Sequence, residues 1–101
     1  MLAEFSVAPT GVGESLSEYV AKIMDVIDKS GLEYKAGPMG TVVEGDWDEV
    51  MDLIKRCHFT MMEFSNRVYT RIAIDDRKGA TGRIEGKIAD VEKHLIRKLK
   101  K

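Results

Sequence analysis

Two hydrophobic periods alternate along this chain of 101 residues, and their order constrains the fold more than any other feature. Apolar residues that alternate with polar ones, or short β-branched runs, predict four strands at 2–8, 32–36, 41–44 and 67–75. Apolar residues at steps of three and four predict three helices, over about 15–30, over 46–62 and from 83 onward. The predicted order is therefore strand, helix, strand, strand, helix, strand, helix.

This order predicts an α+β fold with a four-stranded antiparallel sheet. Two split βαβ units place both crossover helices on one face in the ferredoxin-like βαββαβ arrangement, because right-handed crossovers leave few alternatives, and the last helix is additional. We expect residues 1–101 to form a single domain, since this length supports one core. The helix-free sheet face carries Glu4, Ser6, Tyr69 and Arg71 among apolar neighbours, so we expect another subunit to cover it.

Composition and charge exclude several partners. A formal net charge of -1, from 16 basic and 17 acidic side chains, provides no field that would gather nucleic-acid phosphates. The apolar runs are short and the N-terminal residues lack the pattern of an export signal, so we expect a cytoplasmic protein without a membrane partner. Cys57 is the single cysteine, and His58 and His94 stand alone, so no disulfide, metal or cofactor is expected.

Several functions found on ferredoxin-like folds have requirements that this chain does not meet. Metal carriers and electron-transfer ferredoxins need paired or multiple cysteines, and an RNA-binding sheet needs exposed aromatics where the first strand offers Glu4 and Ser6. A phosphatase of the acylphosphatase type needs an arginine in the loop after the first strand, and residues 9–14 contain no basic side chain. With no nucleophile and base in a recognisable arrangement, we predict that the protein is not an enzyme.

The stretch 35–45, Lys-Ala-Gly-Pro-Met-Gly-Thr-Val-Val-Glu-Gly, is the strongest candidate site. A tight turn is followed by Thr41 and Glu44, a polar pair between a turn and a helix start, which indicates a place where a small molecule or another subunit is received. In the purely structural alternative, Thr41 satisfies the turn, Glu44 caps the next helix or pairs with a lysine, and Arg67 forms a surface ion pair. The two valines between Thr41 and Glu44 leave open which of the pair faces the helices.

Five stretches resemble the YkoF-like thiamine-binding family, at 5–11, 30–32, 37–45, 67–77 and 87–88. The most specific of them is Gly-Pro-Met-Gly-Thr-x-x-Glu-Gly. The resemblance implies a ferredoxin-like subunit that self-associates through its sheet faces into dimers or dimers of dimers. It also implies non-enzymatic binding of thiamine or its hydroxymethylpyrimidine part at or near a subunit interface.

By this resemblance Ser6, Thr41 and Glu44 face the pyrimidine, and Arg67 and Tyr69 line the same site. An aminopyrimidine offers an amine donor and ring-nitrogen acceptors, which suit a carboxylate and hydroxyl groups. The alternative is a structural or regulatory interaction module that uses the open sheet face and the edge strands and takes no small ligand.

Overall fold

The computed structural model describes residues 1–13, 16–79, 81–95 and 98–99. The elements are β1 (Leu2–Pro9), α1 (Ser17–Lys29), β2 (Glu33–Ala36), β3 (Thr41–Glu44), α2 (Trp47–Met62), β4 (Val68–Asp75) and α3 (Arg83–Leu95). The predicted order of strands and helices is confirmed. The predicted start of the first helix at Ser15 lies outside the described residues.

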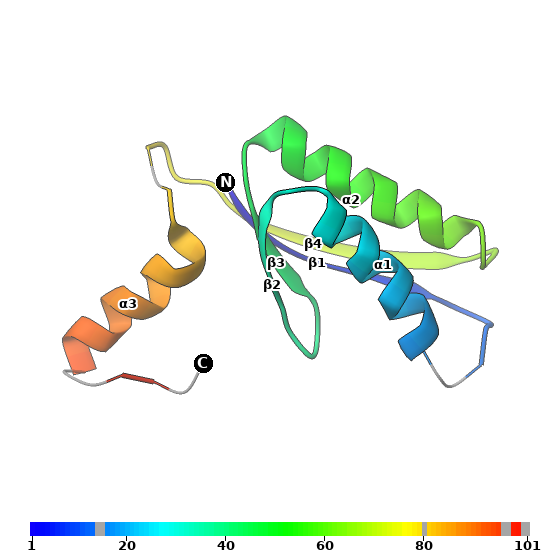
Figure 1. The fold of residues 1–101 in the computed structure, drawn as a ribbon, viewed down its shortest axis with the longest axis horizontal. Helices are drawn as coiled ribbons and strands as arrows, with labels where there is room; N and C mark the ends of the chain where they lie inside the picture. Colours follow the sequence, from blue (N-terminus) through cyan, green and yellow to red (C-terminus); the bar gives the residue numbers. More distant parts are fainter. Residues whose placement is uncertain (14–15, 80, 96–97, 100–101) are drawn as a thin grey trace.

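The four strands form one antiparallel sheet in the order β2-β3-β1-β4. α1 and α2 pack side by side over one face, and α3 lies apart from them beyond the end of the sheet (Figure 1). This is the ferredoxin-like topology with an additional C-terminal helix, as the sequence predicts. No helix in the described part of the chain is long and apolar enough to cross a membrane.

The strand register assigns each residue to a face of the sheet. Ala3 pairs with Val43 on one side and Phe5 pairs with Thr41, and all four are buried beneath the helices. Because side chains alternate along a strand, Glu44 belongs to the opposite, open face. Thr41 and Glu44 therefore point to opposite faces of the sheet, which settles the orientation that the sequence left open.

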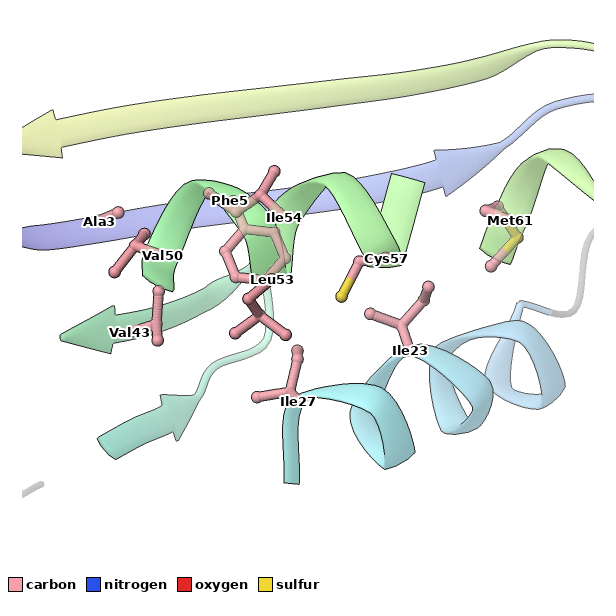
Figure 2. Packing of buried hydrophobic residues seen from close by; sticks show 10 residues of the cluster. All are labelled: Ala3, Phe5, Ile23, Ile27, Val43, Val50, Leu53, Ile54, Cys57 and Met61. Atoms are coloured by element: carbon pink, nitrogen blue, oxygen red, sulfur yellow. The ribbon is translucent and has the colours of Figure 1, made fainter. Parts of the chain in front are cut away.

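The core lies between the helices and the sheet (Figure 2). Its buried apolar residues are Ala3, Phe5, Ile23, Ile27, Val43, Val50, Leu53, Ile54, Cys57 and Met61. Apolar residues at helical spacing predict an inward stripe on α2, namely Trp47, Val50, Ile54, Cys57 and Met61. This stripe is confirmed except at Trp47, which is 54% exposed. Trp47 is the first residue of α2, so no preceding helical turn lies under its side chain. Leu53, which the predicted stripe did not include, is completely buried.

The ends of the crossover helices follow local chemistry. The Asp46 side chain accepts from the Glu49 amide and the Glu49 side chain accepts from the Asp46 amide, which is the capping box that the sequence predicts for α2. α1 is followed by Gly31 at a φ of 79°, a left-handed conformation that favours glycine after a helix. α2 therefore begins, and α1 ends, where the chain turns between a helix and the sheet.

Candidate functional site

The second half of β1 has a strand on one side only. β1 pairs with β4 from Leu2 to Pro9, whereas its pairs with β3 end at Phe5. Among the described residues, no strand lies beside residues 6–9 on the β3 side. Backbone N–H and C=O groups on that side are therefore available to a ligand.

A groove of about 280 Å³ opens at this edge, between β1, α1 and the β2–β3 turn. Its walls are mainly apolar and include Val7, Leu16, Val20, Ile23, Met24 and Pro38. The turn approaches β1 closely, because a Cβ placed on Gly40 would lie 3.0 Å from the carbonyl oxygen of Phe5. Glycine at this position thus holds the turn against the strand and shapes one wall of the groove.

Ser6 and Thr41 are the two hydroxyl-bearing residues that border this groove. Their side chains belong to different faces of the sheet, because Thr41 pairs with the buried Phe5, whereas Ser6 pairs with Arg71 on the open face. Thr41 is only 7% exposed, and its Oγ1 donates a hydrogen bond to the sulfur of Met24 at 3.7 Å. A thioether is a weak acceptor, so the hydroxyl can exchange this bond for a better one to a ligand. Ser6 also lines a neighbouring hollow of about 130 Å³, together with Glu4 and Arg71.

A serine in the loop before β4 fixes the far end of β1. Ser65 is 7% exposed, and its Oγ accepts from the amides of Thr10 and Arg67, both at 3.3 Å. The same hydroxyl lies 2.7 Å from the carbonyl oxygen of Thr10 and 2.8 Å from that of Arg67. The sequence analysis did not identify Ser65. The only sequence signal is a serine in a loop, because such side chains often hydrogen-bond to nearby backbone groups. The Ser65 bonds keep the ends of β1 and β4 together near the groove.

Glu44 has a different environment, at the N-terminus of α3. Its carboxylate accepts hydrogen bonds from the Arg83 amide at 2.9 and 3.1 Å and from the Ile84 amide at 3.3 Å. A negative charge is favourable there, because the first amides of a helix have no intrahelical acceptor and carry partial positive charge. A hydrogen-bonded ion pair between Lys87 and Asp75 adds a second attachment, and this bond holds the pKa of Asp75 below its ordinary value.

The structure distributes the five predicted site residues over four places. Ser6 and Thr41 line the groove beside α1, and Glu44 caps α3. Tyr69 lies on the open face, opposite Ala8, and is 61% exposed. Arg67 precedes β4, and its described contacts are backbone hydrogen bonds. One chain therefore brings only Ser6 and Thr41 to the same groove, and the five-residue ligand set stays a prediction.

The thiol of Cys57 and the imidazole of His58 each lie in an environment that explains them structurally. Cys57 is buried in the core, and burial raises the pKa of its thiol to about 11, which keeps it protonated and unreactive. The Nδ1 atom of His58 lies 2.7 Å from the Thr70 hydroxyl, between α2 and β4. The described part of the chain contains no group of three or more His, Cys, Asp or Glu side chains that could hold a metal ion.

The sequence matches the profile of the thiamine-binding protein family over residues 3–92, and the chain belongs to this family. Among its relatives, a UPF0045 protein of Methanocaldococcus jannaschii is 40% identical over 88 residues, which cover 87% of this chain and 88% of that protein. A UPF0045 protein of Mycobacterium tuberculosis is 40% identical over 98 residues, 96% of each chain.

Solved structures agree with this assignment. The crystal structure of a hypothetical protein from Methanocaldococcus jannaschii has a TM-score of 0.83 and 39% identity, covering 89% of this chain and 93% of that chain. A protein of Thermotoga maritima described as a putative thiamine biosynthesis/salvage protein has a TM-score of 0.78 and 28% identity, covering 89% and 96% of the two chains.

Proposed function

We propose that this protein binds thiamine or its hydroxymethylpyrimidine part, without chemically changing it, in the groove that contains Ser6 and Thr41. In this proposal the protein is a cytoplasmic homo-oligomer, with the ligand at or near a contact between subunits. The single observation that carries the proposal is an apolar groove bordered by the Thr41 hydroxyl, beside an unpaired strand edge, in a member of the thiamine-binding protein family. The Thermotoga relative, described as a putative thiamine biosynthesis/salvage protein, supports the same ligand class.

The chemistry of the groove suits a flat aminopyrimidine. Apolar walls can hold the two faces of the ring, while the Thr41 hydroxyl and the free backbone groups of β1, including those of Ser6, provide donors and acceptors for its edge. The groove of about 280 Å³ lies just below the roughly 300 to 1,000 Å³ of typical small-molecule pockets. A pyrimidine ring therefore suits one chain, and larger ligands would use a wall from a second copy.

The lining also favours binding over catalysis. The described residues that line the groove include no carboxylate, imidazole, thiol or amine side chain. Proton transfer and nucleophilic attack need such groups within hydrogen-bond reach of the ligand. Glu4, which borders the adjacent hollow with Ser6, offers a negative charge that would favour the positive thiazolium of thiamine. Glu44, Arg67 and Tyr69 would contribute across a subunit contact.

Calorimetric titration of the purified protein with thiamine and with hydroxymethylpyrimidine tests the proposal. We expect saturable heat and an upward shift of the melting temperature, because a ligand that binds only the folded state stabilises it. Thr41→Val keeps the side-chain shape but removes the hydroxyl, so it should weaken pyrimidine binding about 5- to 30-fold, which corresponds to roughly 1 to 2 kcal/mol for one hydrogen bond. Absence of heat and of any melting shift at millimolar ligand would reject the proposal.

Thr60→Val is the matched control for Thr41→Val, because Thr60 lies on α2 and does not line the groove. The control should bind the ligand as the unchanged protein does. Equal loss in both variants would mean that the effect comes from general destabilisation and would remove Thr41 from the site.

A protein-interaction module without a small ligand is the second candidate function. The observation in its favour is the β4 edge, which has no neighbouring strand beyond it among the described residues. Ile72 and Ile74 on this strand are 42% and 41% exposed, and a long, partly apolar edge can accept a strand from another chain. Stoichiometric capture of one partner protein, with no heat from either ligand, would favour this function.

A further inference from the structure

α3 is amphipathic, but nothing in the described part of the chain buries its apolar side. Ile84, Ile88, Val91 and Leu95 follow one another at steps of four, three and four, which places them on one stripe. None of these side chains is buried, and Val91 and Leu95 are 46% and 44% exposed. A short helix is usually stabilised by packing such a stripe against another element.

Among the described residues, the hydrogen bonds that join α3 to the sheet come from its first turns. Glu44 accepts the amides of Arg83 and Ile84, and Lys87 pairs with Asp75. From there the helix extends away from the sheet as an arm (Figure 1). The radius of gyration is 15.1 Å, larger than the roughly 13 Å of a compact domain of this length. α3 is therefore tied to the sheet at one end only.

The open face of the sheet is an uncovered surface that is partly apolar, like the stripe of α3. A hollow of about 320 Å³ on this face has Leu2, Val42 and Ala73 in its lining, and it is bordered by the acidic residues Glu4 and Asp75, of which Asp75 already pairs with Lys87 of its own chain. The arm is followed by a basic sequence, with four cations between residues 97 and 101. An apolar stripe with a basic end thus complements an apolar hollow with an acidic border.

We propose that two copies of this chain exchange their α3 arms, so that the apolar stripe of each arm packs into the open-face hollow of the other copy. Glu44 and Asp75, which hold the arm, both pair with Leu2 in the sheet register, so the arm begins at one end of the open face. Because it extends away from its own sheet, a two-fold axis can place it across a second copy, and the same contact then forms twice. The inference specifies the self-association in the proposed function and does not depend on the ligand.

Disulfide cross-linking between two variants that each carry one introduced cysteine tests the exchange. Val42→Cys lies on the open face and Val91→Cys on the stripe, and the native Cys57 is buried and does not compete. An equimolar mixture should form a mixed disulfide of twice the chain mass under mild oxidation. Lys93→Cys, on the side of α3 opposite the stripe, should give little or none with Val42→Cys.

Three results would overturn the exchange. The first is absence of the mixed disulfide, and the second is equal yield from Lys93→Cys and Val91→Cys. The third is efficient closure within one chain of the double variant Val42→Cys with Val91→Cys at high dilution, because the arm would then fold onto its own sheet.

Sedimentation of two aspartate variants gives an independent test. Val91→Asp places a charge in the stripe and should reduce the assembly to a smaller species, whereas Lys93→Asp should sediment like the unchanged protein. Both should melt as the unchanged protein does when extrapolated to low concentration, since neither residue contributes to the core. Identical assembly of all three proteins would overturn the proposal.

Ligand titration separates this inference from the proposed function. If thiamine or hydroxymethylpyrimidine binds while the cross-link fails, only the arm exchange is rejected. If the cross-link forms while no ligand binds, only the ligand assignment is rejected.

Discussion

The helix-covered face of the sheet and the α3 arm carry the same kind of sequence pattern but differ in burial. Ile27 on α1 and Leu53 on α2 are completely buried against the sheet, whereas no residue of α3 is buried. All three helices have an apolar stripe at helical spacing. The comparison teaches that a stripe indicates that a face needs covering, without specifying whether the same chain covers it.

Connectivity explains the difference. α1 and α2 each join two strands of one sheet, so both of their ends are held close to it and their stripes must lie over it. α3 follows the last strand and no strand follows it in the described residues. Its first turns are fixed by Glu44 and by the Lys87–Asp75 pair, whereas Val91 and Leu95 further along the helix remain exposed.

Truncation of one stripe residue in each region should give the largest contrast. Leu53→Ala should lower the free energy of unfolding by about 2 to 5 kcal/mol, because it removes a fully buried side chain and leaves a cavity. Val91→Ala should change it by less than about 0.5 kcal/mol at low protein concentration, since its side chain is half exposed in the single chain. Urea unfolding measures both, and equal losses would break the comparison.

The Ser65 clamp should have a smaller effect on the covered region. Ser65→Ala should cost about 1 to 3 kcal/mol, because the amides of Thr10 and Arg67 lose the acceptor that Ser65 provides. Urea unfolding reports the loss, and hydrogen exchange should show faster exchange at the paired ends of β1 and β4. A Thr60→Ala variant, whose side chain makes no described hydrogen bond, serves as the control. Unchanged stability in Ser65→Ala would show that water replaces the clamp.

Neutralising Glu44 should loosen the arm without affecting the core. Glu44→Gln keeps an acceptor but removes the charge at the N-terminus of α3, so the amides of Arg83 and Ile84 should lose about 0.5 to 1 kcal/mol of protection. Hydrogen exchange measures this loss, and Glu4→Gln on the same face is the control. Loss of pyrimidine binding with full protection of α3 would instead make Glu44 a ligand-binding residue.

The ion pair between Lys87 and Asp75 should give the smallest effect, visible as a pH dependence. The hydrogen bond from Lys87 lowers the pKa of Asp75, so the pair stabilises the folded chain above pH about 4 and this contribution is lost as the pH falls through the lowered pKa. Carboxyl titration by NMR should show an upward shift of the Asp75 pKa toward its ordinary value in Lys87→Ala. An unchanged pKa in that variant would remove this attachment of the arm.

Much of the fold follows from local sequence patterns. Alternation along 67–75 and the Asp46 capping box predict β4 and the start of α2 closely, because strand period and helix capping are properties of neighbouring residues. The exposure of Trp47 was predicted wrongly, since a helical stripe does not reveal where the supporting sheet ends. The long-range clamp at Ser65 depends on a contact with Thr10 across 55 residues, which no local pattern contains.

The candidate site was predictable only in part. Thr41 and Glu44 are close in sequence and were expected together, yet a spacing of three in a strand sends them to opposite faces. The signature stretch thus serves two places: its turn and Thr41 form the groove, and its Glu44 holds α3. Val42 and Val43 are both apolar, so the facing became clear only from the strand register.

The central claim is that the pyrimidine binds in the groove beside α1 and away from the open face. Titration of the isotope-labelled protein with hydroxymethylpyrimidine, followed by methyl and aromatic NMR, tests it most directly. The account predicts shifts at the methyl groups of Thr41, Val20 and Met39, and any shift of the Tyr69 ring would accompany them through a second copy. Shifts confined to Tyr69 and its neighbours on the open face, or no shift at millimolar ligand, would contradict it.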